Sequence, residues 1–210
     1  MHDSPILILL AGGKSQRMGT PKGLLDYHST YWILEQISRY KHIDNPKVYI
    51  GLGYDFQEYF KTIPWLEQAL NSFYKYNGVE VKVILNKKPE YGTFSTLQAV
   101  LKTVNINASV IIQPIDVPLV DKHSLKVILN EDNLIVIPTC DGKNGHPVQL
   151  KLEFWNRLLT VDVTSNDARL DRQIKQFNSL SITYIKVIDS SIYQNINTKE
   201  DWILYKKSST

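Results

Sequence analysis

The stretch ILILLAGGKSQRMGTPK, which spans residues 6–22, decides the fold of this chain. Its first five residues, 6–10, are all apolar, and such a run is typical of a strand that is covered on both faces of a sheet. Gly12 and Gly13 follow almost at once, and adjacent glycines let the backbone turn sharply and come close to a ligand. The segment therefore predicts a buried strand that leads into a ligand-binding loop.

Outward from this segment, β-rich runs alternate with helical patterns along the chain. The predicted strands are 6–10, 47–51, 79–85, 109–113, 134–138 and 181–188. The predicted helices are 31–40, 56–69, 93–104, 122–129, 152–159 and 168–177. This alternation predicts an α/β fold, a single three-layer Rossmann-like domain with a mostly parallel mixed sheet. Ligands of such sheets bind beyond the carboxyl ends of the strands, so the loops that follow the strands are the expected site.

Length and composition bound the possible classes of protein. A chain of 210 residues favours one domain, placed at 1–205, with a flexible polar tail at 206–210. Hydrophobic residues make up 43% and charged residues 21%, which is globular composition. The net charge of +3 is too small to indicate a nucleic-acid or membrane partner. Cys140 is the only cysteine, which excludes an intramolecular disulfide and a cysteine zinc cluster. With no export signal and no apolar stretch long enough for a membrane span, a cytoplasmic location is expected.

The loop after the first strand carries groups that suit a polyphosphate. Ser15, Arg17 and Lys22 place a hydroxyl and two cations within one short segment. The spacing of the glycines excludes both the G-x-G-x-x-G dinucleotide fingerprint and the Walker loop. From the residues alone, a glycine turn with solvated charges stays open as the alternative.

The segment 10–22 resembles the signature L-A-G-G-x-S-x-R-M-G-x-x-K and fits each of its fixed positions. That signature belongs to the MobA/MocA-like nucleotidyltransferases, which are related to molybdenum-cofactor guanylyltransferase and cytidylyltransferase. The resemblance implies a fold of the nucleotide-diphospho-sugar transferase (GT-A-like) type. It also implies that Arg17 and Lys22 hold the triphosphate and act in catalysis. Residues implied to contact the nucleoside are Leu10, Ala11, Gly12 and Gly13, with Ser15 beside them.

Two further segments resemble the family's metal-binding elements. Residues 114–119 are similar to its D-x-P element, which implies that Asp116 is catalytic and binds Mg²⁺. A lone carboxylate at a strand end suits Mg²⁺, which takes its other ligands from phosphate and water. Residues 195–202 resemble N-I-N-T-P-E-D, which makes Asn197 the second metal ligand. Each segment also has a structural alternative, a turn at Asp116 and a helix cap formed by Thr198 with Asp201.

Two other loops give candidates for substrate binding. Residues 86–97 look like a cytidylyl-type loop, which implies that Ser95 and Thr96 contact the nucleotide; an ordinary helix start is the equal alternative. Residues 142–148 resemble G-x-x-G-H-P-V, which implies an acceptor site at Gly145 and His146. A structural hydrogen-bonding role for His146 stays open. Asp121 is expected only to cap the helix that follows it.

The resemblance implies a metal-dependent transfer of NMP from an NTP, with GTP or CTP expected, to a small phosphate-bearing acceptor such as molybdopterin, with release of pyrophosphate. The sequence mixes the two branches, because 92–94 lacks the guanylyl G-P-L and 161–169 lacks the glycines of the cytidylyl G-D-x-G-A-R. The base, the acceptor and the oligomeric state are therefore left open. Alternatives are a non-catalytic nucleotide-binding protein on the same fold, a sugar-phosphate nucleotidyltransferase, or a glycosyltransferase. For the last, the usual Asp-x-Asp pair is missing at 116–118.

Overall fold

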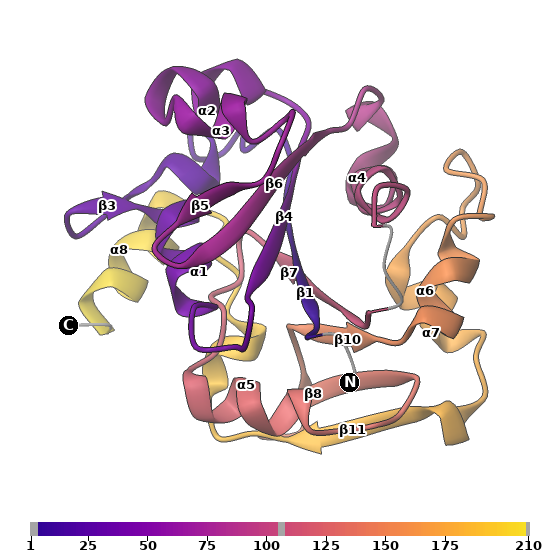
Figure 1. Cartoon of the computed structure of the whole chain (residues 1–210). Coiled ribbons are helices and arrows are strands. Elements are labelled where there is room, and N and C mark those ends of the chain that lie inside the picture. The colour runs from indigo at the N-terminus through magenta and orange to yellow at the C-terminus, as the bar shows by residue number, and fades with distance from the viewer. Residues whose placement is uncertain (1–3, 105–107, 209–210) are drawn as a thin grey trace.

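A nine-stranded sheet runs through the centre of the molecule in the computed structural model, which describes residues 4–104 and 108–208 (Figure 1). Its strands are β1 (Ile6–Ala11), β4 (Lys47–Leu52), β5 (Tyr74–Tyr76), β6 (Val79–Leu85), β7 (Val110–Pro114), β8 (Ile135–Cys140), β9 (Lys143–Asn144), β10 (Val148–Leu150) and β11 (Ile182–Lys186). A separate hairpin pairs β2 (Asp26–Tyr27) with β3 (Thr30–Tyr31).

The sheet is mixed and mostly parallel, as the alternating pattern predicts. Its strand order is β11-β8-β10-β7-β1-β4-β6-β5, with β9 added on β8. The central strand β1 pairs in parallel with both β4 and β7. Strand β10 is antiparallel to its neighbours β7 and β8, and β5 is antiparallel to β6. The parallel strands β1, β4 and β7 thus end at one edge, where the loops that follow them meet.

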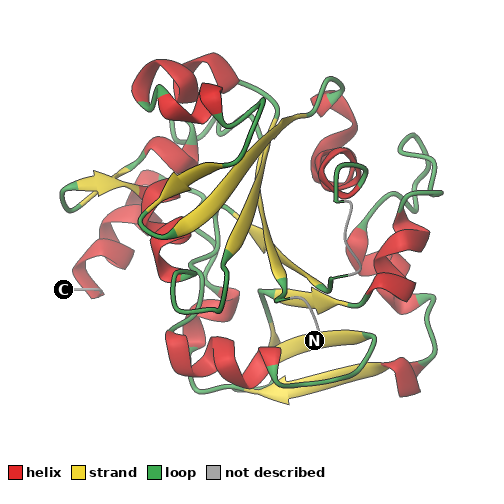
Figure 2. Cartoon of the chain, in the orientation of Figure 1, coloured by secondary structure: helices red, strands yellow, loops and turns green. Residues whose placement is uncertain are grey.

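Helices cover both faces of the sheet (Figures 1 and 2). One layer holds α1 (Trp32–Arg39), α2 (Phe56–Thr62), α3 (Trp65–Gln68), α5 (Lys122–Leu129) and α8 (Lys199–Ser208). The other holds α4 (Gly92–Leu101), α6 (Leu152–Leu158) and α7 (Leu170–Lys175). Short 3₁₀ turns are η1 (Lys22–Leu24), η2 (Pro89–Tyr91), η3 (Ser179–Ser181) and η4 (Ser190–Tyr193).

The apolar strand β1 shows why the sheet needs helices on both of its faces. In β1, Leu7, Leu9 and Ala11 join the core under the α1 layer. The alternate residues, 6, 8 and 10, join the core under the α4 layer. All six side chains are buried, because successive residues of a strand point to opposite faces. A continuous apolar run is therefore stable only between two layers of helices.

The predicted helix 56–69 is wrong as one element, since the structure divides it into α2 and α3. The break falls at Ile63, whose φ of −131° and ψ of 80° are not helical. Pro64 follows, and a proline disfavours the helical region for the residue before it. Pro64 also lacks the N–H that a continuous helix would use.

Other boundaries differ by a few residues, and some short strands have no counterpart in the predictions. Strands β5 and β10 have only three residues each, so their hydrophobic pattern is too short to read. Helix α8 continues to Ser208, three residues into the predicted tail. Residues 209–210 of that tail, and residues 1–3 of the predicted domain, lie outside the described part of the chain. Within the described residues, none of the helices has the length and apolar character needed to cross a bilayer.

Candidate active site

The glycine loop begins where β1 ends, and its first glycine lies in close contact with α4. A Cβ on Gly12 would come within 2.7 Å of the Thr96 Oγ1 atom. The Gly12 carbonyl accepts a hydrogen bond from the Tyr54 N–H at 3.2 Å, which ties the loop to the end of β4. Gly13, in contrast, is exposed and has open space where a side chain would be. The two glycines therefore differ in role: one packs, and the other leaves the loop backbone accessible to a ligand.

The rest of the loop is closed by its own hydrogen bonds. The Ser15 Oγ atom accepts from the backbone N–H of Lys22 at 3.1 Å, and the Ser15 carbonyl accepts from the Met18 N–H at 2.9 Å. Met18 is buried and anchors the loop in the core. Ser15, predicted to contact the nucleotide, thus has a structural role in holding the backbone of Lys22 in place.

Three predicted site residues meet at one point, although they lie 94 and 175 residues apart in the sequence. The Lys22 ammonium donates to Asp116 Oδ2 at 3.0 Å and to Asn197 Oδ1 at 2.9 Å. The side chains of Lys22 and Asp116 are 13% and 29% exposed. A cation therefore sits between one carboxylate and one amide oxygen, at the rim of the sheet.

Buried polar groups of α1 fix the loop that carries Asp116. The Trp32 indole N–H donates to the Ile115 carbonyl at 2.7 Å. The Gln36 side chain donates to the Val117 carbonyl and accepts from the Leu119 N–H, both at 2.8 Å. Gln36 is fully buried. Sequence reasoning missed it; a glutamine among the apolar residues of an amphipathic helix is the signal that would have found it.

The segment that carries Asn197 is held by a helix cap and by the Asp116 loop. The Ile196 N–H donates to the Asp116 carbonyl at 2.8 Å. Asp201 Oδ2 accepts from the N–H groups of Asn197 and Thr198, while Thr198 Oγ1 accepts from the Asp201 N–H. The two backbone hydrogen bonds lower the pKa of Asp201. The capping box is therefore present, and it also positions Asn197 beside Asp116.

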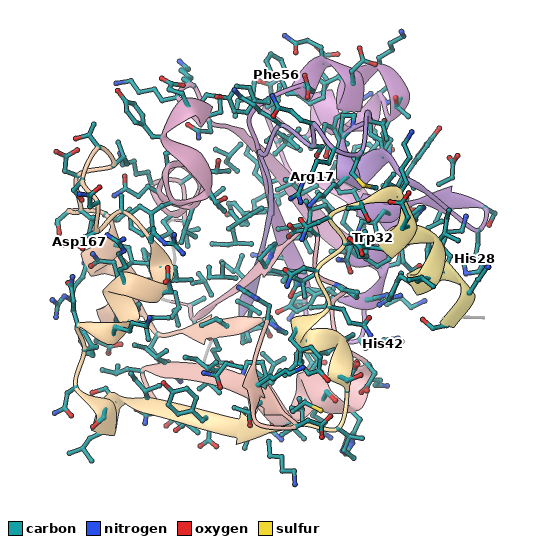
Figure 3. The ribbon with its side chains drawn as sticks, turned by 180° about the vertical axis from the view of Figure 1, so that it is seen from behind. Arg17, His28, Trp32, His42, Phe56 and Asp167 are labelled. Atoms are coloured by element: carbon teal, nitrogen blue, oxygen red, sulfur yellow. The ribbon has the colours of Figure 1, made fainter. Side chains whose placement is uncertain are left out.

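Arg17 lies at the surface near the start of α8 (Figure 3). Its positive charge adds to the lowering of the Asp201 pKa. In the part of the chain that the structure describes, the Arg17 guanidinium makes no hydrogen bond or ion pair, which leaves its donors accessible to an anion.

The chemistry of Asp116 and Asn197 fits a hard divalent cation. Both offer oxygen atoms, and one ammonium already lies within 3.0 Å of both. Across residues 4–104 and 108–208, no three His, Cys, Asp or Glu side chains gather as a metal-binding group. A site with two protein oxygens suits Mg²⁺, which is commonly held by one or two side chains together with phosphate and water.

A cavity of about 850 Å³ lies between the start of α4, α7 and η4, and His146 is among the residues that line it. Its wall is mainly apolar and includes Leu10 at the end of β1, and also Gly145 and His146. Burial lowers the pKa of His146, and the charge of Asp116 opposes this shift. The His146 N–H donates to the Ile192 carbonyl at 2.8 Å. His146 thus has a structural backbone contact, and it also lines the cavity within range of the Asp116 charge.

The hydroxyls of Ser95 and Thr96, which are predicted to contact the nucleotide, form hydrogen bonds within the protein. Both residues are buried, and the Asn86 side-chain NH₂ donates to Ser95 Oγ at 2.8 Å and to Thr96 Oγ1 at 3.0 Å. They join the loop after β6 to α4. Other residues of the segment 86–97 line the cavity, namely Tyr91, Gly92, Thr93, Phe94 and Leu97. Helix α4 begins at Gly92, whose φ is positive, a backbone conformation that favours glycine. The motif resemblance did not predict this feature.

Sequence reasoning also missed two cations of α7. Arg169, the N-cap of α7, and Lys175, its last residue, line the cavity together with Asp171, and Arg169 pairs with Asp171 at 3.0 Å. The motif comparison treated 161–169 only as a departure from the family pattern. The cavity thus combines mainly apolar walls with two cations and one carboxylate.

Comparison with models of protein families shows to which family the chain belongs. The model of the MobA-like NTP transferase domain matches residues 7–179. The chain belongs to this family. Its activity class is therefore nucleotidyl transfer, with an NTP as substrate. No curated relative matches the chain in sequence.

Solved structures similar to this one come from several organisms. Rv0371c of Mycobacterium tuberculosis in complex with manganese has 16% identity and a TM-score of 0.67, and the match covers 98% of this chain and 100% of that one. A nucleotidyl transferase from Methanothermobacter has 15% identity, a TM-score of 0.69 and coverages of 98% and 97%. Molybdopterin-guanine dinucleotide biosynthesis protein A from Archaeoglobus fulgidus has 17% identity, a TM-score of 0.65 and 97% coverage of both chains. At these identities the likeness shows the α/β fold, which agrees with the family.

Proposed function

We propose that this chain transfers a nucleoside monophosphate from an NTP to a small phosphate-bearing acceptor, with release of pyrophosphate and with help from a divalent metal ion. The observation that carries the proposal is the cation position between Asp116 and Asn197. It is occupied by the ammonium of Lys22, the last residue of the glycine loop signature. The last residue of the loop that would hold phosphate thus contacts both of the oxygen atoms that would hold Mg²⁺.

The arrangement divides into a donor side and an acceptor side. On the donor side, the exposed backbone at Gly13 is open to the nucleoside, and Arg17 and Lys22 supply positive charge for the triphosphate. On the acceptor side, the cavity that His146 and Arg169 line offers mainly apolar walls. His146 lines this cavity within range of the Asp116 charge, so it would lie near the point where the acceptor phosphate meets the α-phosphorus.

The chemistry asked of the protein is positioning and charge neutralisation. The acceptor phosphate attacks the α-phosphorus in line, and pyrophosphate leaves; little covalent work by side chains is needed. Arg17 and Lys22 would stabilise the negative charge of the leaving pyrophosphate. A metal ion held by Asp116 and Asn197 would polarise the α-phosphate. His146, whose lowered pKa favours the neutral ring, would orient the acceptor by a hydrogen bond.

We further propose GTP or CTP as the donor and a molybdopterin-like compound as the acceptor, in the cytoplasm. The mostly apolar cavity, which Arg169 also lines, suits a flat, partly apolar molecule that carries a phosphate. The Archaeoglobus protein of similar fold is described as acting in molybdopterin-guanine dinucleotide biosynthesis. Sugar phosphates are the competing acceptors, and they would leave the apolar wall with little to contact.

The test is pyrophosphate release from each of four NTPs with Mg²⁺, in the presence of molybdopterin, sugar phosphates or small phosphonates. We expect one NTP and one acceptor class to give turnover. Arg169→Ala should raise the KM for the acceptor and leave the Kd for the NTP unchanged. Tight NTP binding without pyrophosphate release from any pair would instead support a non-catalytic nucleotide-binding protein. Equal acceptor KM values in the variant and the parent would show that the acceptor does not bind in the cavity beside α7.

A further inference from the structure

We propose that Lys22 is a removable counter-cation, which fills the metal position in the nucleotide-free protein and leaves it when a triphosphate binds. The inference rests on the proposed function in one respect, that an NTP is the anion that draws Lys22 away. Its structural basis is that one ammonium contacts both proposed metal ligands, Asp116 at 3.0 Å and Asn197 at 2.9 Å.

Geometry makes the ammonium and a metal ion mutually exclusive. Mg²⁺ binds oxygen ligands at about 2.0–2.1 Å, so an ion bound by both side chains would lie between the same two oxygens as the Lys22 nitrogen. Two cations that close together repel strongly, and the partial burial of the Lys22 side chain, 13% exposed, limits screening by water. One of them must therefore leave before the other binds.

Charge balance also requires that the Lys22 ammonium leaves before a metal ion binds. Asp116 supplies the one formal negative charge of the pair, and the Lys22 ammonium neutralises it. A divalent ion added beside that ammonium would leave an excess of positive charge that neither Asn197 nor the nearby Arg17 can reduce. A bound triphosphate removes this excess, and it also supplies the oxygen ligands that two protein side chains cannot. The metal position is thus complete only when the nucleotide is present.

The loop is built so that the side chain of Lys22 can move without its backbone. The Lys22 N–H is held by Ser15 Oγ at 3.1 Å, and the Leu24 and Leu25 N–H groups close the following turn on Pro21 and Lys22. The contacts to Asp116 and Asn197 come only from the end of a long flexible side chain. Rotation of that side chain toward phosphates would free both metal ligands and leave the loop intact.

The decisive experiment titrates nucleotide-free protein with Mn²⁺ and measures free Mn²⁺ by electron paramagnetic resonance. Lys22→Met, which removes the charge and keeps the length, should bind Mn²⁺ about tenfold more tightly than the parent, or about 1.4 kcal/mol. Lys14→Met is the matched control, because the Lys14 ammonium lies over the Tyr54 ring, 4.8 Å from its centre, and not on Asp116. Its Mn²⁺ affinity should equal that of the parent.

Adding Asp116→Asn to Lys22→Met should abolish the gain. Equal Mn²⁺ affinity in the parent and in Lys22→Met would overturn the proposal, and so would a gain that persists without the Asp116 carboxylate. If Lys22→Met does not fold, as judged by circular dichroism, Lys22→Gln carries the same comparison with a neutral polar side chain.

A separate titration keeps this inference distinct from the proposed function. Calorimetry with GTP and CTP in the presence of a chelator measures whether a metal-free triphosphate binds. Absence of binding both in this titration and in a repeat with Mg²⁺ would contradict the proposed function, while the Mn²⁺ titration would still decide whether Lys22 competes with the metal. If triphosphate binds but the Mn²⁺ affinities are equal, the function stands and the counter-cation role is refuted.

Discussion

Alanine replacements at the two adjacent glycines should have opposite consequences. Gly12→Ala is expected to lower the stability of the fold, whereas Gly13→Ala should leave stability unchanged and weaken nucleotide binding. The reason is local space. A Cβ on Gly12 would lie 2.7 Å from Thr96 Oγ1 and 3.3 Å from the Gly53 nitrogen, whereas a Cβ on Gly13 would have no neighbour within 4 Å.

The magnitude follows from how firmly the neighbour is held. Thr96 is buried and accepts a hydrogen bond from Asn86 at 3.0 Å, so its hydroxyl cannot simply turn away. Overpacking of this kind costs about 1–3 kcal/mol. For a chain of this size, each kcal/mol lowers Tm by about 2–4 °C. Gly13→Ala, at an exposed position, should change the free energy of unfolding by less than about 0.5 kcal/mol.

Urea denaturation followed by circular dichroism gives the free energy of unfolding for each variant, and calorimetry gives the Kd for the NTP. Thr96→Ala removes the two side-chain atoms closest to a Cβ on Gly12. The double variant Gly12→Ala/Thr96→Ala should therefore lose less stability than the sum of the single variants, with a coupling of about 0.5–3 kcal/mol. Similar losses of stability at Gly12 and Gly13 would refute the assigned packing, and an unchanged Kd in Gly13→Ala would refute the open-backbone role.

Three further perturbations test other parts of the site. Arg17→Ala should raise the Kd for the NTP about tenfold, as expected for loss of about 1.4 kcal/mol. Its Tm should not change, because Arg17 is exposed. Calorimetry and a thermal melt measure the two quantities, and a lowered Tm with an unchanged Kd would contradict the assignment. Asp201→Ala removes the cap of α8 and should cost about 1 kcal/mol in urea denaturation. It should also raise the Mg²⁺ concentration needed for activity by freeing Asn197, and an unchanged Mg²⁺ requirement would contradict this role. Because burial lowers the pKa of His146, the unfolded chain binds the extra proton as pH falls below about 6.5 and stability declines. His146→Gln should reduce the loss of stability between about pH 7.5 and pH 5; identical pH profiles of the variant and the parent would show that His146 is not the group responsible.

Local patterns predicted those features that depend on neighbouring residues. The apolar run of β1 and the two glycines after it indicated a strand and a loop at the edge of a parallel sheet, and the structure has both. The T-x-x-D spacing of Thr198 and Asp201 indicated a cap, and the hydrogen bonds are present. The cap at Asp121 was likewise predicted, and Asp121 Oδ1 accepts from the Ser124 N–H at 2.8 Å.

Features that arise from tertiary contacts were beyond the reach of the sequence. The motif resemblance predicts that Lys22 binds phosphate, but only folding brings its ammonium between Asp116 and Asn197. The same holds for Ser95 and Thr96. Their hydroxyls look available in a helix start, yet Asn86 takes both of them from a loop nine and ten residues away.

Transfer of labelled phosphate tests the central claim most directly. The protein is incubated with Mg²⁺ and the acceptor, and with either α-³²P- or γ-³²P-labelled NTP. The account predicts that α-label appears in the acceptor product and γ-label in pyrophosphate. Both should fall on the order of 10³-fold in Asp116→Asn, which corresponds to about 4 kcal/mol of transition-state stabilisation. Release of γ-label as inorganic phosphate, or undiminished transfer in Asp116→Asn, would contradict it.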